Sequence, residues 1–153
     1  EDYVSIPDLL RENLFVFNTL AKLLYPLAAL VSGVCIGSGL ELALCVDARV
    51  VSEDALLGLP ETSFDLMPGC TGIGRLRNTT RQAKVIEIVL GAQLFDASYA
   101  LDCGIADCIL PRKNFKEKAS ELCEQILSDA KGRLGKIALR SKLRKAHSSR
   151  KYD

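Results

Sequence analysis

The sequence predicts an α/β fold built around a parallel sheet, and three observations lead to this prediction. A continuous apolar run at residues 27–31 is typical of a strand buried on both faces, as strands of parallel sheets are. A glycine turn follows it and opens a helical segment at residues 40–45. A second strand pattern comes next, at residues 48–51. The chain therefore begins a strand, turn, helix and strand succession.

The first element is a helix over residues 7–24. Apolar residues recur there at helical spacing, which is typical of an amphipathic helix with one buried face. Pro26 ends this pattern, because proline lacks the backbone N–H that a helix interior needs. The helix therefore leads directly into the first strand.

Gly37, Ser38 and Gly39 form the turn before the second helix. Ser38 is placed to cap this helix, since a serine oxygen can accept a backbone N–H of the first turn. After the second strand, glycine and proline recur often enough to predict a loop of defined shape. The two segments of this loop are residues 58–61 and 68–72.

The second half of the sequence predicts helices and one short strand. Two of the helices end at Gly91 and Gly104, and Asp96 is expected to cap the second of them. Pro111 closes the strand, and the last helix lies in a basic tail. The helices and the strand cover residues 81–90, 96–103, 105–110, 114–130 and 131–151.

Composition indicates one globular domain over residues 1–153, with 48% hydrophobic and 25% charged residues. The 20 basic and 19 acidic residues nearly cancel, which argues against nucleic acid or an anionic membrane as a partner. The apolar stretch at residues 26–33 is too short to span a membrane, and the acidic start is unlike a signal peptide. The absence of an initial Met suggests a fragment or a processed chain.

Cysteine usage favours free thiols in a reducing, intracellular compartment. The six cysteines lie mostly within apolar runs, and no pair has the C-x-x-C spacing. There is only one histidine, so no metal site is predicted. The expected location is the cytoplasm or, in a eukaryote, an organelle such as the mitochondrion or peroxisome.

Two glutamates are the candidate catalytic residues. Glu41 lies in the first turn of the helix after the glycine turn, and Glu61 lies in a Pro-Glu step of the loop. Either one alone has an ordinary structural explanation, because helix starts favour acids and loops carry solvated ones. The glycine turn lacks the third glycine of a dinucleotide fingerprint, whereas a helix N-terminus can also stabilise an oxyanion.

Two long motifs resemble the crotonase, or enoyl-CoA hydratase/isomerase, superfamily. Residues 26–47, PLAALVSGVCIGSGLELALCVD, resemble the family pattern K-P-V-I-A-A-V-x-G-x-x-x-G-G-G-x-E-L-A-x-x-x-D. Residues 58–76, GLPETSFDLMPGCTGIGRL, resemble G-x-P-E-x-x-x-G-x-x-P-G-x-G-G-x-x-R-L. The resemblance covers about residues 7–130 and implies the crotonase-type ββα spiral, in part, with residues 131–153 as a basic helical tail.

The resemblance implies an enoyl-CoA hydratase, a lyase of fatty acid metabolism that adds water to a 2-enoyl-CoA. Glu41 and Glu61 match the two catalytic carboxylates, and the turn at Gly37 and Ser38 matches the oxyanion and substrate-binding segment, with the Ser38 N–H as a donor. Coenzyme A is then part of the acyl-CoA thioester substrate, and no separate cofactor is implied. The family also implies a homo-oligomer, a trimer or a hexamer.

Three departures from the family pattern leave alternatives open. Ser38 replaces the middle glycine of the turn, and Asp65 stands where the loop usually has glycine, near the expected acyl pocket. The family's first strands, with the second oxyanion donor, and its terminal helices have no counterpart here. The alternatives are an enoyl-CoA isomerase and a truncated, non-catalytic chain that binds CoA thioesters or assembles with longer subunits. Arg75, Arg77 and Arg81 have two interpretations, either contact with the phosphates of CoA or a charged helix start that faces water, and the second is favoured.

Overall fold

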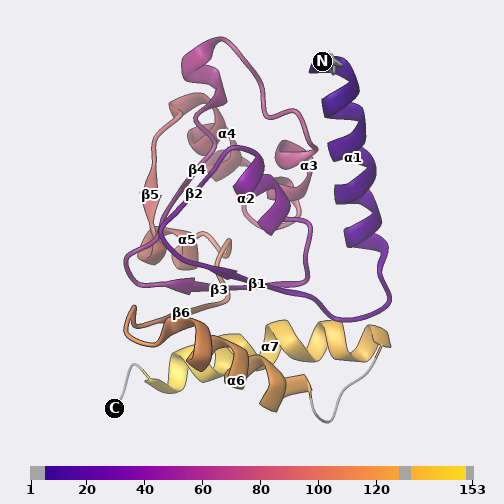
Figure 1. The fold of residues 1–153 in the computed structure, drawn as a ribbon. Coiled ribbons are helices and arrows are strands. Elements are labelled where there is room, and N and C mark those ends of the chain that lie inside the picture. The colour runs from indigo at the N-terminus through magenta and orange to yellow at the C-terminus, as the bar shows by residue number, and fades with distance from the viewer. Residues whose placement is uncertain (1–5, 128–131, 151–153) are drawn as a thin grey trace.

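The computed structural model describes residues 6–127 and 132–150, and it confirms an α/β fold with parallel strand pairing (Figure 1). Strand pairs β1–β3, β3–β6 and β2–β4 are all parallel, and β4–β5 is antiparallel. The strands are β1 (Ala28–Val31), β2 (Val34–Ile36), β3 (Ala48–Ser52), β4 (Leu56–Gly58), β5 (Phe95–Asp96) and β6 (Cys108–Leu110).

The strands form two small sheets, ordered β1-β3-β6 and β2-β4-β5. Each half of the segment 28–36 belongs to a different sheet, with only Ser32 and Gly33 between β1 and β2. The segment 48–58 repeats this arrangement through β3 and β4, so it runs beside the first segment in both sheets. Two strands followed by a helix thus form the repeating unit of the fold.

Helices occupy most of the remaining chain. The first half contains α1 (Ile6–Lys22), α2 (Ser38–Ala43), the 3-10 helix η1 (Glu61–Phe64) and α3 (Gly72–Arg77). The second half contains α4 (Gln82–Gly91), α5 (Ala97–Asp102), α6 (Phe115–Leu127) and α7 (Gly132–Arg150). None of the helices described is long and apolar enough to cross a membrane.

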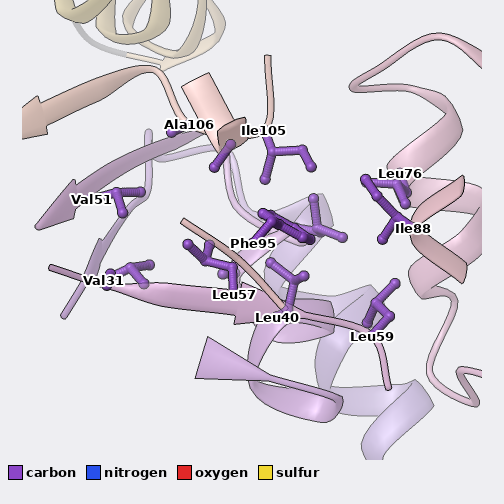
Figure 2. Packing of buried hydrophobic residues seen from close by; sticks show 14 of the residues in the cluster. Val31, Leu40, Val51, Leu57, Leu59, Leu76, Ile88, Phe95, Ile105 and Ala106 are labelled. Atoms are coloured by element: carbon purple, nitrogen blue, oxygen red, sulfur yellow. The ribbon is translucent and has the colours of Figure 1, made fainter. Parts of the chain in front are cut away.

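Strand β3 separates two apolar clusters, because its side chains alternate between the two faces of the sheet and all are buried. Val51 faces the larger cluster, whose residues come from both sheets and from α2 to α5 (Figure 2). Val50 faces the second cluster, formed with α6 and α7. Figure 1 shows these two helices as a layer beneath β1, β3 and β6, with the other helices on the opposite side.

The basic segment at the C-terminal end is not a detached tail. Leu139 and Leu143 of α7 are fully buried in the second cluster. They share this cluster with Phe115 and Ala119 from the buried face of α6. Helix α7 also contacts β3 and β6. Its basic residues are therefore carried on a helix that belongs to the core.

The structure corrects the prediction that the first strand is buried on both faces. Leu30 of β1 is exposed, and only Val31 is fully buried in this strand. The physical reason is that β1 lies at the edge of its sheet in the described part of the chain, with β3 as its one neighbour. Strand β3, in the centre of that sheet, has the two-sided burial instead.

Several short elements were absent from the sequence prediction, namely β2, β4, η1 and α3. Each has six residues or fewer, so none offers a periodic pattern long enough to recognise. The predicted strand at residues 105–110 shortens to Cys108–Leu110, because Ile105 and Ala106 lie in the turn after α5. All six cysteines are free, as predicted.

Candidate active site

Glu41 lies in the first turn of α2, and its side chain is only 1% exposed. Its Oε1 atom accepts two backbone hydrogen bonds, from the N–H groups of Cys70 and Gly72, each at 2.8 Å. Charged acceptors make strong hydrogen bonds of this kind, and two donors on one oxygen also fix the orientation of the carboxyl group. The loop before α3 therefore holds Glu41 in one position.

Gly72 is required at this point by close packing against Glu41. A Cβ atom placed on Gly72 would lie 2.6 Å from Glu41 Oε1 and 2.8 Å from its Cγ. No real side chain tolerates such a contact, so only glycine allows the backbone to come this near. The sequence prediction did not assign Cys70 and Gly72 to the site. Their only signal was their place in the turn-rich segment of the second motif.

Glu61 is the first residue of η1, and the fold brings it to the turn that opens α2. A Cβ atom placed on Gly37 would lie 3.3 Å from Glu61 Oε1. Gly37 has a φ of 55°, a conformation that favours glycine. The two glutamates predicted from the sequence thus lie at the same turn. Glu41 lies within α2, and Glu61 lies against Gly37 at the N-terminal end of that helix.

The pKa of Glu61 is raised above its ordinary value, chiefly because burial disfavours the charged form. The negative charge of Glu41 adds to this shift, whereas a hydrogen bond from the backbone of Glu61 opposes it. Glu61 Oε2 is buried and has no hydrogen-bond partner among the described residues. Glu61 is therefore the carboxyl group of this pair that is suited to carry a proton.

This raised pKa has a consequence for stability. A carboxyl group with a higher pKa in the folded state stabilises the fold at low pH, and this contribution is lost as pH rises through the folded pKa. We expect Glu61→Gln, which cannot ionise, to become more stable relative to the parent as pH rises above about 4.5, the ordinary value. Thermal unfolding of both proteins across pH measures this difference, and a constant difference would contradict the raised pKa.

The backbone N–H groups at the turn of Gly37 and Ser38 are not equally available as hydrogen-bond donors. The Gly37 N–H donates to the carbonyl of Gly58 at 3.0 Å, so it is already used. The Ser38 and Gly39 N–H groups belong to the first turn of α2 and have no acceptor within the helix. Ser38 does not have a positive φ, so serine is tolerated in place of glycine.

The predicted capping role of Ser38 is wrong. Gly37 occupies the N-cap position of α2, and no side chain caps this helix. Ser38 is the first residue inside the helix. Its backbone N–H, rather than its hydroxyl group, is therefore the donor left open at the start of the helix. Asp96 does cap α5 as predicted, since its side chain accepts the Tyr99 N–H at 2.8 Å.

Asp65 ends η1 in a left-handed conformation, with a φ of 56°. Such a backbone conformation favours glycine, and aspartate is among the other residues that adopt it most often. The neighbouring side chains of Phe64, Leu66 and Met67 are all exposed. A negative charge thus sits within an exposed apolar loop beside the glutamate pair.

Comparison with known proteins now fixes the family. The family model described as Enoyl-CoA hydratase/isomerase matches residues 9–152. The chain belongs to this family. Its fold is accordingly the α/β crotonase fold, of which the chain represents a part.

Related proteins of known sequence come from both bacteria and eukaryotes. The chain is 35% identical over 126 residues to the fatty acid oxidation complex subunit alpha of Vibrio vulnificus. This match covers 76% of the chain and 18% of that protein. It is 31% identical over 126 residues to a probable mitochondrial enoyl-CoA hydratase of Dictyostelium discoideum, covering 82% of the chain and 46% of the relative. The chain thus spans less than half the length of these relatives.

Solved structures show the same relation. The enoyl-CoA hydratase from Bacillus anthracis superposes with a TM-score of 0.78 at 26% identity, covering 92% of the chain and 54% of that structure. A putative enoyl-CoA hydratase from Thermobifida fusca in complex with acetoacetyl-CoA gives a TM-score of 0.73 at 26% identity, covering 90% and 52%. The chain again corresponds to about half of each structure.

Proposed function

We propose that this chain acts as an enoyl-CoA hydratase, a lyase that adds water to the double bond of a 2-enoyl-CoA. The observation that carries the proposal is the meeting of Glu41 and Glu61 at the turn that opens α2. Addition of water needs a base for the water and an acid for the neighbouring carbon, so two carboxyl groups in different environments suit it. Coenzyme A enters as part of the substrate.

The two glutamates receive different roles from their surroundings. Glu41, held by two backbone N–H groups, orients the water and takes a proton from it as the oxygen attacks C3 of the enoyl group. Glu61, whose pKa is raised by burial, delivers a proton to C2. The product has the hydroxyl group on C3 and the new hydrogen on C2. Glu41 then releases the proton taken from water and Glu61 takes up a proton, by exchange with solvent, so both carboxyl groups return to their starting states and the net addition is one water.

The negative charge that develops on the thioester oxygen needs a hydrogen-bond donor. The Ser38 N–H at the start of α2 is placed for this role, since it points out of the first turn and needs no reorganisation. One such donor typically contributes about 3 kcal/mol to stabilising the transition state. We propose that a second donor comes from residues outside this chain.

Crotonyl-CoA hydration by the 153-residue chain tests the proposal. The expected result is loss of the conjugated thioester absorbance together with formation of 3-hydroxybutyryl-CoA. A 3-enoyl-CoA offered in parallel separates the isomerase alternative, because an isomerase forms the 2-enoyl thioester without taking up water. Conversion of the 3-enoyl substrate alone would overturn the hydratase proposal in favour of the isomerase.

A non-catalytic chain is the second candidate, and the observation that favours it is length. The chain covers about half of the solved structures that it resembles, and Ser38 is the one oxyanion donor that we assign among its described residues. This candidate predicts binding of a CoA thioester without turnover. Calorimetric titration with crotonyl-CoA distinguishes it, since binding without hydration would exclude catalysis by the chain on its own.

Assembly into trimers or hexamers is part of the same proposal. Helix α4 supports it by exposing Ile86 and Leu90, which lie four residues apart and therefore on one face of the helix. Large exposed apolar side chains that gather on one face are typical of interfaces. Light scattering coupled to size-exclusion chromatography gives the mass in solution, and a monomer at micromolar concentration would contradict the assembly.

Gly72→Ala is expected to lower turnover by about 100-fold, because the added Cβ would displace the Glu41 carboxyl group from its two donors. Gly74→Ala is the matched control two residues away in α3. A Cβ atom there meets nothing within 4 Å, and alanine favours a helix over glycine, so activity should be retained. Steady-state rates of the two variants provide the comparison, and equal rates would show that the position of Glu41 does not matter.

A further inference from the structure

A cluster of arginines lies around Asp107, at the C-terminal end of α2 and away from the glutamate pair. The Asp107 side chain is fully buried. Its Oδ1 atom accepts hydrogen bonds from Nε of Arg140 at 2.9 Å and from Nε of Arg144 at 2.8 Å. Its Oδ2 atom accepts from Nη2 of Arg49 at 3.3 Å. One carboxylate therefore faces three guanidinium groups.

Arg49 is the buried member of this cluster, with 3% of its side chain exposed. Its Nε atom donates to the carbonyl of Ile105, and its Nη1 atom donates to the carbonyls of Ala43 and Val46, so both atoms have acceptors. Burial nevertheless lowers its pKa to about 10; the charge of Asp107 opposes this shift, whereas the charges of Arg140 and Arg144 add to it. The single charge of Asp107 is thus shared by Arg49 with two further guanidinium groups.

A polar hollow of about 240 Å³ adjoins the cluster. Its lining includes Arg49 from β3, Arg75 from α3 and Arg140 from α7, together with Asn78 and Thr79 at the end of α3. The guanidinium groups of Arg75 and Arg140 each direct Nε and Nη2 to protein acceptors. Their Nη1 atoms have no acceptor among the residues described.

One acidic residue, Asp47, also lines the hollow, but its charge is engaged elsewhere. Its Oδ2 atom accepts the Leu27 N–H at 2.9 Å, and its Oδ1 atom lies 3.2 Å from Nζ of Lys136. The hollow and its ion pairs together hold five cationic side chains and two carboxylates in the described part of the chain. These are Arg49, Arg75, Arg140, Arg144 and Lys136, against Asp47 and Asp107.

We propose that this hollow binds a phosphate group between Arg75 and Arg140. Uncompensated charge held close to the interior is costly, and a bound dianion offsets that cost. Guanidinium groups match the tetrahedral oxygens of phosphate with paired N–H donors, and this geometry is why arginine is preferred for phosphate recognition. The Asn78 amide, also on the lining, can add a further donor, whereas the Thr79 hydroxyl already donates to the Arg75 carbonyl at 2.9 Å.

Two sources can supply this phosphate group, namely free inorganic phosphate and a phosphate of coenzyme A. The site itself does not depend on the hydratase proposal, because its argument uses only the arginine cluster and the hollow. Only the second source rests on the proposed function. A titration with inorganic phosphate involves no acyl-CoA, so its failure and a failure of hydration are distinguishable.

Calorimetric titration of the chain with inorganic phosphate, at constant ionic strength set by chloride, tests the site. Saturable binding is expected, and Arg75→Gln and Arg140→Gln are each expected to weaken it by about 10-fold or more, since each removes charge-assisted hydrogen bonds. Two variants are used because Arg140 also supports Asp107, whereas Arg75 does not contact it. Arg112→Gln is the control, since Arg112 is largely exposed and pairs with Asp54 elsewhere.

No saturable binding, or equal weakening by Arg112→Gln, would overturn the site and leave only general charge attraction. Where phosphate binds, competition with coenzyme A and with pantetheine, which has no phosphate, identifies the source. Displacement by coenzyme A alone assigns the bound group to a CoA phosphate, and displacement by neither supports a site for free phosphate.

Discussion

Replacing Glu61 with glutamine is expected to lower the hydration rate of crotonyl-CoA by about 10²–10⁴-fold, the range in which general acid–base catalysis contributes. The substitution keeps the shape of the side chain but removes the proton that the carboxyl group would deliver to C2. Because Glu61 Oε2 has no partner among the described residues, the added amide breaks no hydrogen bond there. The loss should therefore appear in kcat, with little change in the affinity for the thioester.

Glu41→Gln should cause a similar loss for a different reason. The amide oxygen of glutamine can still accept the N–H groups of Cys70 and Gly72, so the loop before α3 keeps its position. What disappears is the base that takes a proton from water. Glu121→Gln, on the exposed face of α6, is the control for removing one negative charge. Rates of these variants within a few-fold of the parent would show that the two glutamates do not act as proposed.

The pH dependence of turnover should add to this result. Hydration requires one carboxyl group protonated and the other ionised, so the rate should fall where both are protonated and where both are ionised. Since burial raises the pKa of Glu61, the decline on the alkaline side should begin above the ordinary glutamate range. A rate that does not change with pH in this range would remove Glu61 from the acid role.

The sequence predicted that Glu41 and Glu61 act together because each lies in a long motif with fixed spacing, and the structure places both at the turn that opens α2. It also predicted the helices with clear periodicity or caps, such as α1, α5 and α6. These features are local, since spacing, proline and capping residues act within a few positions of the chain. The sequence also predicted a parallel sheet, and β1 and β3 do pair in parallel, although β1 lacks the two-sided burial on which that prediction rested.

The sequence could not predict the contacts that fix these residues in space. The two N–H donors to Glu41 come from residues 29 and 31 positions later, and no local pattern indicates which backbone groups will face a carboxylate. Exposure of Leu30 depends on whether another strand lies beside β1, which a single strand pattern does not contain. Likewise, the sequence predicted the segment that forms α7 only as a basic helical tail, although Leu139 and Leu143 anchor it in the core.

The arginine cluster illustrates the same limit, since it holds the C-terminal end of α2 through a residue of β3. Arg49 donates to the carbonyls of Ala43 and Val46, at the C-terminal end of the helix whose first turn carries Glu41. Cationic groups near helix C-termini are favourable, because they complement the partial negative charge there. Helix α2 is therefore held at its start by the loop before α3 and at its end by a side chain from β3.

Asp107→Asn is expected to destabilise the protein by about 3–5 kcal/mol, the cost of leaving a buried charge without its partner. Arg49 is buried and would remain among Arg140 and Arg144 with no carboxylate to balance them. Asparagine keeps the volume, and its amide oxygen can still accept the Arg49 backbone N–H that Asp107 accepts at 3.0 Å. Its NH2 group cannot accept from Arg140 and Arg144, so the loss reports the charge together with these two hydrogen bonds. Urea denaturation of both proteins at neutral pH measures the difference in free energy of unfolding.

Asp54→Asn is the matched control, because Asp54 also pairs with an arginine, Arg112, but does so at the surface. Surface ion pairs contribute little, since water screens both charges whether or not they meet. The free energy of unfolding should therefore change far less in this variant than in Asp107→Asn. Equal effects in the two variants would mean that burial of Asp107 adds nothing, and α7 would then be held by Leu139 and Leu143 rather than by its arginines.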